Sequence, residues 1–343
     1  MILPIRLRGK DLKPHKATVA PLIDARTVLT NSPWQFVSLW LSREGKKNAL
    51  FYWNQAHEFA QASTGIGLQS APLLHYYSFM NAAKALLEAK NINFEPYHGA
   101  TGNSVTSKRI DLKNEVVKIK SNGILPSLAE YLGDSETDKS HTLKQLMFNL
   151  PYIHRTYCLT YPRQPELFFP LSDCCYVFDT HSKEAYLRGK LSSEFSEKRH
   201  LKRLPATFVP DTADNYIRSA ASVIIASSVI STPEDMRSIT GLNQHIRKDL
   251  NYINAAETLW YAKATVSGSQ RLRRSPLTMT LAAMHRLSEI CRYRPLQLQK
   301  FLTGHGNWLL NEFVTMAPQQ FIDGIAAELT GHQFMLPNVR PAS

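Results

Sequence analysis

The sequence predicts a mainly α-helical protein of the α+β type, with helical bundle lobes and a small β-rich middle segment. Apolar residues recur at the helical spacing of about 3.6 over residues 76–87 and again over residues 276–293. Between these stretches, residues 166–178 are dense in aromatic and β-branched side chains, which is typical of strands. We therefore expect three consecutive parts: an N-terminal helical lobe (1–160), a β-rich segment (161–215), and a C-terminal helical lobe packed on the first (216–343).

The N-terminal lobe is expected to begin with an extended arm and to continue as helices. Residues 1–30 are basic and contain three prolines, which favour an extended chain over a helix. Ser32 can cap a helix that has Pro33 in its first turn. A second helix is predicted over residues 48–63, and the strongest apolar pattern predicts a third over residues 70–88.

The chain becomes less regular after this third helix. Residues 125–132 predict a short helix, and residues 141–157 predict helix as far as an interruption at Pro151. The apolar stretch 220–230 is too short to cross a bilayer and is expected to form a buried element. The expected strands are 166–169, 174–178, 186–187, 207–209 and 259–262.

The C-terminal lobe has a clear helix start and a final helical pair. Thr232 is followed by a proline and two acidic residues, the pattern of a capped N-terminus. Residues 276–293 and 296–316 predict the final pair, with Pro318 marking a later break.

Composition indicates an ordinary globular chain with a large basic excess. Apolar residues make up 43% and charged residues 20% of the 343 residues, so a packed core is expected and wholesale disorder is excluded. The 40 lysines and arginines against 28 acidic residues give a net charge of +12. An excess of this size favours either solubility alone or a polyanion partner, RNA or DNA above all.

The cysteines and the N-terminus indicate a cytoplasmic protein. The four cysteines have no C-x-x-C spacing and are expected to be reduced. The N-terminus lacks an apolar stretch of signal-peptide length, and no segment predicts a membrane association. No cofactor and no metal are expected, because the sequence contains no phosphate-binding loop, dinucleotide fingerprint, metalloprotease motif or nucleophile elbow.

Two basic segments are the predicted contacts for nucleic acid. Clustered cations on exposed loops neutralise phosphates, and a solvated charge run is the competing interpretation. The predicted nucleic-acid-binding residues are Lys198, Arg199, Lys202 and Arg203 in the first segment, and Arg271, Arg273 and Arg274 in the second.

Two groups of polar residues are candidates for a pocket or an active site. Tyr77, Asn81 and Lys84 share one helix face, with His98 in the turn that follows, and are pocket candidates; a solvated face is the alternative. Gly99 after His98 can supply a left-handed backbone. The second group, His285, Glu289 and Arg292, also shares a helix face and could perform acid–base chemistry. Alternatively, Glu289 pairs with Arg292 as a structural bridge.

Two stretches of the chain resemble a known bacterial family. Ser70-Ala-Pro-Leu-Leu-His-Tyr-Tyr-Ser-Phe-Met-Asn-Ala-Ala-Lys-Ala-Leu-Leu87, with His98-Gly99 after it, resembles the YaaC-like proteins. So does Leu287-Ser-Glu-Ile-Cys-Arg-Tyr-Arg-Pro295, preceded by Trp260-Tyr261. The two stretches lie far apart in the chain, so the resemblance covers most of it. It implies a fold rather than a mechanism.

The first stretch also resembles the central helix of HEPN domains, which makes the N-terminal lobe HEPN-like. HEPN domains are helical bundles found in prokaryotic toxin and anti-phage systems, and many are metal-independent ribonucleases whose signature is an Arg and a later His with four to six residues between them. Only Arg8 and His15 match by spacing, in a segment that contains Pro14. Elsewhere the order is reversed, as in His154-Arg155.

Three functions compete at this point. The leading hypothesis is a non-catalytic nucleic-acid-associated protein, a subunit of a prokaryotic anti-phage defence assembly. The second is an HEPN-like metal-independent ribonuclease that uses an unorthodox pair, His154 with Arg155 or His285 with Arg292. The third is a scaffold subunit that binds an acidic protein partner within a multi-subunit complex.

Overall fold

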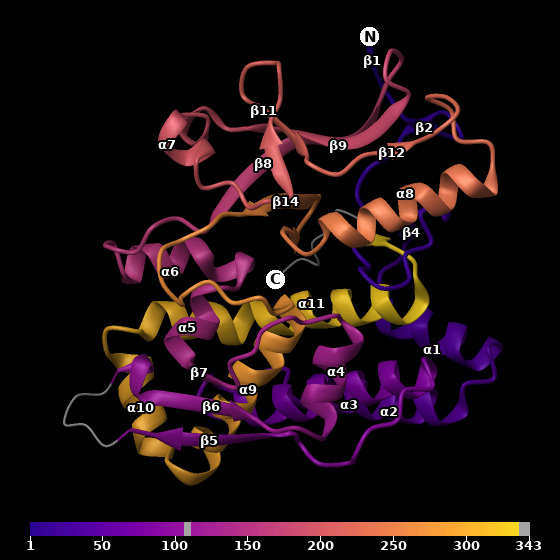
Figure 1. The fold of residues 1–343 in the computed structure, drawn as a ribbon. Coiled ribbons are helices and arrows are strands. Elements are labelled where there is room, and N and C mark those ends of the chain that lie inside the picture. Colours follow the sequence, from indigo (N-terminus) through magenta and orange to yellow (C-terminus); the bar gives the residue numbers. More distant parts are fainter. Residues whose placement is uncertain (106–110, 336–343) are drawn as a thin grey trace. The chain divides into compact units, whose positions relative to one another are not determined.

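The computed structural model describes residues 1–105 and 111–335, which form two compact units (Figure 1). Both units are assembled from segments that alternate along the chain, instead of the three consecutive parts expected. Among the described residues, the β-rich unit consists of Met1–Val28, Glu166–Ser267 and Gly331–Met335, and the helical unit of Leu29–Pro165 and Gly268–Thr330.

The β-rich unit is organised around one antiparallel sheet. Its strand order is β10-β11-β9-β8-β14-β13, with β1 beside β8 and β12 beside β9. The strands are β1 (Ile2–Pro4), β8 (Phe168–Asp179), β9 (Glu184–Leu191), β10 (Phe208–Pro210), β11 (Tyr216–Ser219), β12 (Val223–Ile224), β13 (Leu250–Asn254) and β14 (Thr258–Lys263). Smaller strands are β2 (Arg6–Leu7), β3 (Lys10–Asp11), β4 (Val28–Leu29), at the boundary of the two units, and β15 (Phe334–Met335).

The core of the β-rich unit lies between the sheet and helix α8 (Pro233–Ile246). Alternate residues of β8, such as Tyr176 and Phe178, pack in one hydrophobic cluster with Ile239 and Leu242 of α8. Thr232 caps α8 as predicted, because its Oγ1 accepts a hydrogen bond from the amide of Asp235 at 3.1 Å. The short α7 (Lys198–Leu201) follows the 3-10 turn Ser193–Phe195.

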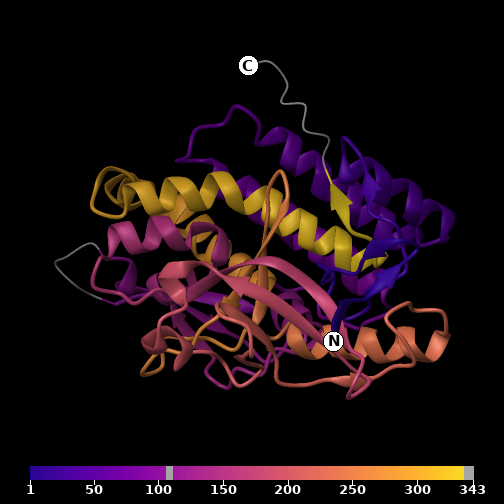
Figure 2. The same cartoon turned by 90° about the horizontal axis from the view of Figure 1, so that it is seen from above.

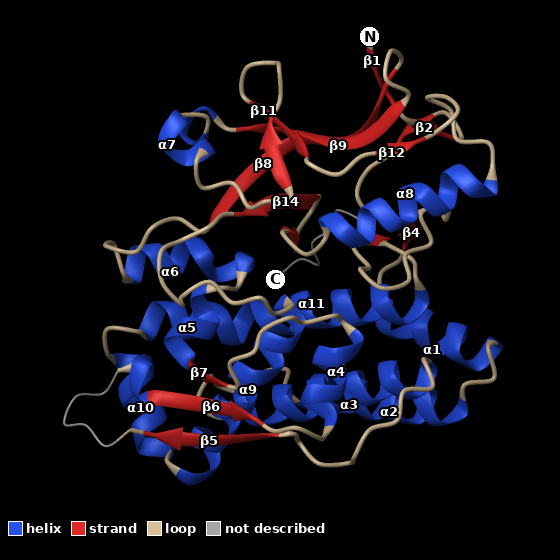
Figure 3. Ribbon diagram, in the orientation of Figure 1, coloured by secondary structure: helices blue, strands red, loops and turns tan. Residues whose placement is uncertain are grey.

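The helical unit contains the remaining helices and a small sheet (Figure 3). Its helices are α1 (Pro33–Arg43), α2 (Lys47–Ala62), α3 (Ala71–Ala89), α4 (Ile124–Tyr131), α5 (Leu143–Phe148), α6 (His154–Thr160), α9 (Pro276–Tyr293), α10 (Pro295–Thr303) and α11 (Asn307–Thr330). Two 3-10 turns, Leu112–Asn114 and Pro151–Ile153, interrupt the chain. The antiparallel sheet is β5-β6-β7, formed by Ala100–Ser104, Glu115–Ile119 and Ser140–Thr142.

Helix α3 is the centre of the helical unit, because α2, α9 and α11 all pack against it. Thirteen of its nineteen residues are buried, so nearly its whole circumference is covered. Phe79 of α3 stacks on Phe321 of α11, with ring centroids 4.3 Å apart. The small sheet lies against α9, which contacts both β5 and β6. This packing brings the polar residues of α3 and α9 to the same region as the chain around His98.

Several predicted elements are confirmed. The helices at Pro33, 48–63, 70–88, 125–132 and 276–293 are present with boundaries within two residues of the expected ones. Ser32 caps α1, accepting a hydrogen bond from the amide of Gln35 at 3.4 Å. The fold class is confirmed only as a mixture of helix and strand: it contains several sheets, whereas the sequence predicted a mainly α-helical chain with one small β-rich segment.

Other predictions about the elements are wrong. Residues 1–28 contain strands and no helix, as expected of an extended arm, but they belong to the β-rich unit, where β1 pairs with β8, and not to the N-terminal helical lobe. The two strands expected within 166–178 form one strand with a bulge between Ser172 and Cys175, because a bulge absorbs the polar interruption without ending the ladder. The stretch 220–230 is mostly at the surface, with Ile224 70% exposed, so its apolar composition does not mark a core element.

The final helical pair is also divided differently from the prediction. Residues 296–316 fall into two helices, α10 and α11, which are separated at Gly304–Gly306. Helix α11 then continues through Pro318 without ending there (Figure 2). The residues after Pro318 are buried, and their packing stabilises the helix enough to offset the loss of the backbone hydrogen bond that a proline cannot donate.

Candidate functional site

The turn that carries His98 is held by two glycines in close contact. Gly99 has a φ of +74° and Gly123 a φ of +115°, conformations that side chains disfavour. Around them, the carbonyl of His98 accepts a hydrogen bond from the amide of Leu125, and the carbonyl of Gly99 accepts one from the amide of Lys120 at 2.9 Å. The left-handed backbone expected at Gly99 is therefore confirmed. The turn is anchored to the start of α4 and the end of β6.

Three aromatic rings from separate parts of the helical unit converge beside this turn. The hydroxyl of Tyr76 lies 2.6 Å from Nδ1 of His98. The ring of His285 lies with its centroid 5.1 Å from that of Tyr76 and 5.6 Å from that of His98. Tyr76 comes from α3 and His285 from α9, so the packing of these helices fixes the arrangement. We define the histidine cluster as Tyr76, His98, His285, Glu289 and Arg292.

Glu289 connects the histidine cluster to a buried network of charged groups. Its Oε1 lies 3.5 Å from Nε2 of His285 and accepts a hydrogen bond from the amide of Gly102 at 3.3 Å. Its Oε2 accepts one from Nη1 of Arg286 at 2.8 Å. The expected structural bridge from Glu289 to Arg292 is therefore replaced by a bridge to Arg286, three residues away on the same helix.

Arg286 is the centre of this network. It is 5% exposed, and its Nη2 donates to Oε2 of Glu115 at 2.6 Å and to Oγ of Ser104 at 2.7 Å. Gln297 donates to the other oxygen of Glu115 at 2.7 Å, and Nη1 of Arg294 donates to Ser104. Both carboxylates, Glu115 and Glu289, are therefore compensated by Arg286 and by neighbouring donors.

Burial and neighbouring cations hold both histidines in the neutral form near pH 7. Burial lowers the pKa of His285 to about 4, with Glu289 opposing the effect and His98 adding to it. The pKa of His98 is also lowered, first by burial and then by Arg292 and Lys84. Tyr76 has its pKa raised by burial, so its hydroxyl keeps its proton. Neutral imidazoles beside a phenol can accept or relay a proton, which suits acid–base chemistry.

The comparisons with known proteins identify the family. A family model described as YaaC-like Protein matches residues 24–329, which is most of the chain. The chain belongs to the YaaC-like family. Comparisons with curated proteins and with solved structures found no significant match.

The YaaC-like match includes both stretches that carried the resemblance in the sequence, and the histidine cluster takes all its residues except His285 from them. Tyr76 comes from the first stretch, and Glu289 and Arg292 come from the second. The HEPN-like interpretation of the first stretch stays a prediction. Within residues 1–105 and 111–335 of this YaaC-like protein, no helix is long and apolar enough to cross a membrane.

The pocket candidates of the YaaC-like protein have different environments. Tyr77 stacks on Phe59 with ring centroids 5.3 Å apart, which gives it a packing role. Asn81 is 2% exposed, and its Nδ2 donates to the carbonyl of Tyr77, while its Oδ1 finds no hydrogen-bond partner in the part of the chain that the structure describes. Lys84 is half-buried over the ring of Tyr52, and burial lowers its pKa. His98 alone of the four joins the histidine cluster directly.

The first basic segment lies on and around α7 in the β-rich unit. Lys198, Arg199 and Lys202 are exposed, and Arg199 pairs with the exposed Glu197 at 2.8 Å. Arg203 is half-buried and donates to the carbonyls of Glu166 and Thr265. The prediction of an exposed cationic group therefore fits three of the four residues.

The second basic segment lies in the helical unit and is less exposed than predicted. Arg273 is exposed and Arg271 is half-buried. Arg274 is buried: its Nε donates to Nε2 of His141 at 3.0 Å, and its guanidinium lies 3.7 Å from Asp134. The exposure expected of Arg274 is wrong, because the loop turns this side chain toward the acidic segment before β7.

The alternative His/Arg pairs have no arrangement like the histidine cluster. His154 is buried, with Nδ1 3.3 Å from the carbonyl of Phe148, whereas the next residue, Arg155, is exposed. His15 is buried in the β-rich unit with its pKa lowered to about 3, chiefly by burial, and Arg8 is exposed. Neither Arg8 nor His15 is on a helix, unlike the HEPN signature.

Four residues of this region were not singled out in the sequence. Tyr76 was assigned to the apolar face of its helix, and nothing in that pattern indicates that its hydroxyl meets His98. Glu115 belongs to β6, a strand that was not predicted, and Lys120 directly follows that strand. Arg286 could have been found by its spacing, because it lies three residues before Glu289 on a predicted helix.

The lowered pKa of His285 predicts a pH dependence of stability. The unfolded chain binds a proton at this residue below its ordinary pKa near 6.5, whereas the folded chain does so only near pH 4. Stability is therefore lost as the pH falls from about 6.5 toward 4, by roughly 2 kcal/mol at pH 5. Urea unfolding from pH 8 to pH 5 should show a smaller loss for His285→Gln than for the unsubstituted protein.

The matched control for this prediction is His181→Gln, which replaces an exposed histidine. It should leave the pH dependence unchanged, because that side chain is solvated in the folded and unfolded chains alike. An equal loss of stability in His285→Gln and the unsubstituted protein would show that His285 is not the titrating group.

Proposed function

We propose that this YaaC-like protein binds nucleic acid through the exposed cations of α7. Lys198, Arg199 and Lys202 lie within a stretch of five residues and are all exposed at the surface of the β-rich unit. Among the described residues neither Lys198 nor Lys202 has an ion-pair partner. These cations are free to contact phosphates, and the net charge of +12 favours a polyanion over other partners.

The test is a binding series in rising salt with RNA, single-stranded DNA and duplex DNA. Replacing Lys198, Arg199 and Lys202 together with glutamate should weaken binding and reduce the slope of log K against log salt by about 2–3. The matched control carries the same change of charge at Arg43, Lys46 and Lys47 in the helical unit, and it should have a smaller effect. Equal losses of affinity in both variants would show that the α7 cations contribute only through the overall net charge. No binding to any of the three nucleic acids at low salt would disprove the proposal.

The histidine cluster supports a second candidate, a metal-independent ribonuclease. Two neutral histidines, a phenol and the arginine Arg292 are the groups that such a reaction needs for proton transfer and charge stabilisation. Incubation with total RNA in the presence of a chelator distinguishes the candidates. Cleavage that is lost in His285→Ala and kept in His154→Ala would favour the ribonuclease with His285 and Arg292 as the pair.

The wider role that we infer is that of a subunit in a prokaryotic anti-phage assembly. This inference comes from the HEPN-like character of the stretch that forms α3 and from the basic surface. Purification from the native host should recover the protein with its partners. Recovery with an acidic protein and no nucleic acid would instead favour the scaffold function.

A further inference from the structure

We propose that the histidine cluster binds a phosphate group, either as the free anion or as the terminal phosphate of an RNA strand. The site lies wholly within the helical unit and does not include the α7 cations, so it goes beyond the proposed function and can be tested separately. Three independent observations support it: unpartnered buried donors, an excess of cations, and carboxylates that are already compensated.

Among the described residues, two side chains of the cluster, the buried His285 and the half-buried Arg292, have buried nitrogen atoms without a hydrogen-bond partner. His285 is 3% exposed, and neither of its ring nitrogens has a hydrogen-bond partner, although Glu289 is 3.5 Å away. Nε of Arg292 is likewise buried and without a partner. Buried polar groups without partners are uncommon in folded proteins because they lose their hydration without compensation. An acceptor-rich ligand would accept hydrogen bonds from Nε of Arg292 and from the one N–H of the neutral His285 ring.

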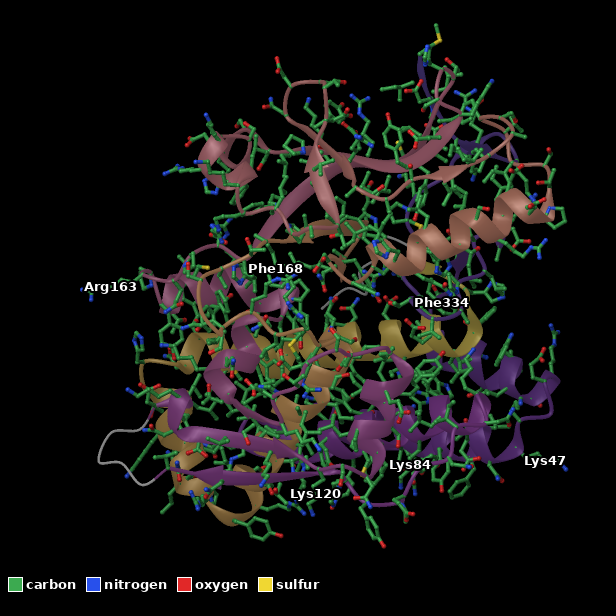
Figure 4. The ribbon with its side chains drawn as sticks, in the orientation of Figure 1. Lys47, Lys84, Lys120, Arg163, Phe168 and Phe334 are labelled. Atoms are coloured by element: carbon green, nitrogen blue, oxygen red, sulfur yellow. The ribbon has the colours of Figure 1, made fainter. Side chains whose placement is uncertain are left out.

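The excess of positive charge around His98 comes from three different elements. Arg292 is on α9, Lys84 on α3, and Lys120 directly follows β6; Figure 4 labels the two lysines. All three act on the same imidazole, since each lowers the pKa of His98. Among the described residues none of the three has an ion-pair partner. A fold that gathers cations in this way pays an electrostatic cost that a bound anion removes.

The two carboxylates nearby do not supply the missing negative charge. Glu115 is 1% exposed and is held by Arg286, Ser104 and Gln297. Glu289 is held by Arg286 and by the amide of Gly102. Arg286 donates hydrogen bonds to both acids, but its single charge balances only one of their two. The remaining negative charge is smaller than the three positive charges of Arg292, Lys84 and Lys120, so the region keeps a net positive charge of about two for a ligand.

A phosphate group fits these donors better than other common anions. It presents three or four acceptor oxygens, which can meet the guanidinium of Arg292, an imidazole N–H and two ammonium groups at once. A terminal phosphate carries close to two negative charges at neutral pH, against one for an internal phosphodiester. The three cations therefore favour a terminal phosphate or the free anion over the interior of a nucleic-acid chain.

The test is isothermal titration calorimetry of the full chain with three probes: inorganic phosphate, an RNA with a 5′-phosphate, and the same RNA with a 5′-hydroxyl. Arg292→Gln and Lys120→Gln should each weaken the binding of phosphate by roughly tenfold or more, because each removes a charge-assisted hydrogen bond. Lys120 is exposed, so its substitution should leave folding intact even if Arg292→Gln does not. Lys47→Gln is the matched control and should bind phosphate as tightly as the unsubstituted protein does, because Lys47 lies apart from Lys84 and Lys120 (Figure 4).

A second readout follows the histidines directly. Bound phosphate should raise the pKa of His98 by adding negative charge beside it, which proton NMR can measure with inorganic phosphate alone. Stronger binding of the 5′-phosphorylated RNA than of the 5′-hydroxyl RNA would identify the terminal phosphate as the ligand, and equal binding of the two would identify the free anion.

The outcomes separate this proposal from the nucleic-acid proposal. Phosphate binding without binding of either RNA would keep the phosphate site and disprove nucleic-acid binding at α7. No heat from inorganic phosphate at tens of millimolar, together with no preference for the 5′-phosphate, would overturn the phosphate site. Unchanged affinity in both Arg292→Gln and Lys120→Gln would overturn it as well.

Discussion

Replacing Arg286 with leucine should lower the free energy of unfolding by about 3–5 kcal/mol. The guanidinium is 5% exposed and donates to Glu115, Glu289 and Ser104. Without it, Glu115 is left at 1% exposure with only the neutral donors Ser104 and Gln297. A buried carboxylate that loses its cation has no hydration to replace the lost interaction, so the whole penalty falls on the folded state.

The control for this prediction is an arginine that contacts the same serine from the surface. Arg294 also donates to Ser104, but its side chain is exposed. Arg294→Leu should therefore cost at most about 1 kcal/mol. Urea unfolding followed by circular dichroism measures both variants under the same conditions. A loss below about 1 kcal/mol for Arg286→Leu would mean that the carboxylates are neutral or hydrated in the folded protein.

A double substitution tests whether the expected loss of stability in Arg286→Leu comes from the uncompensated charge of Glu115. Removing Glu115 together with Arg286, as Arg286→Leu with Glu115→Leu, removes the uncompensated charge as well as the cation. The double variant should be more stable than Arg286→Leu alone, because replacement of both members of a buried pair costs less than removal of one. A further loss of stability in the double variant would contradict this account of the network.

The helices were predictable because their information is local. The apolar spacing of residues 70–88 and 276–293 is a property of each segment alone, and both became helices. The strands β5 and β6 were missed because their sequences do not show a clear alternation of apolar and polar residues: β5 (Ala-Thr-Gly-Asn-Ser) has almost no apolar side chains, and two of the apolar residues of β6 (Glu-Val-Val-Lys-Ile) are adjacent. Their pairing with each other and their contact with α9 are long-range properties that no single segment encodes.

The candidate site was predictable in its parts and not in its assembly. The spacing of His285, Glu289 and Arg292 placed them on one helix face, and His98 was recognised as part of a turn. That the two groups meet depends on how α3 and α9 pack, which the sequence does not reveal without homologues. The interpretation of Glu289 was wrong for the same reason, since its partners include a backbone amide from β5.

Replacing Gly123 with alanine should be as damaging as the loss of Arg286, at about 3–5 kcal/mol, for a different reason. A Cβ at this position would lie 2.5 Å from Cα of Gly99 and 2.7 Å from its nitrogen. Both are backbone atoms, so no side chain can rotate to relieve the contact. The φ of +115° adds conformational strain that an alanine cannot avoid.

Gly133→Ala separates the two contributions to this expected loss. Gly133 also has a left-handed backbone, with a φ of +71°, but a Cβ there would meet no atom within 4 Å. Gly133→Ala should therefore lower the free energy of unfolding only by the cost of holding an alanine in a left-handed conformation, about 1–2 kcal/mol. The remainder of the Gly123→Ala loss then combines two costs: the clash between the two glycines that hold the His98 turn, and the more restricted backbone of Gly123, which has a φ of 115° and a ψ of −178°. Displacement of this turn should also shift the NMR resonances of His98 and Tyr76. Equal losses in both alanine variants, with those resonances unmoved, would show that the approach of Gly123 to Gly99 does not position the histidine.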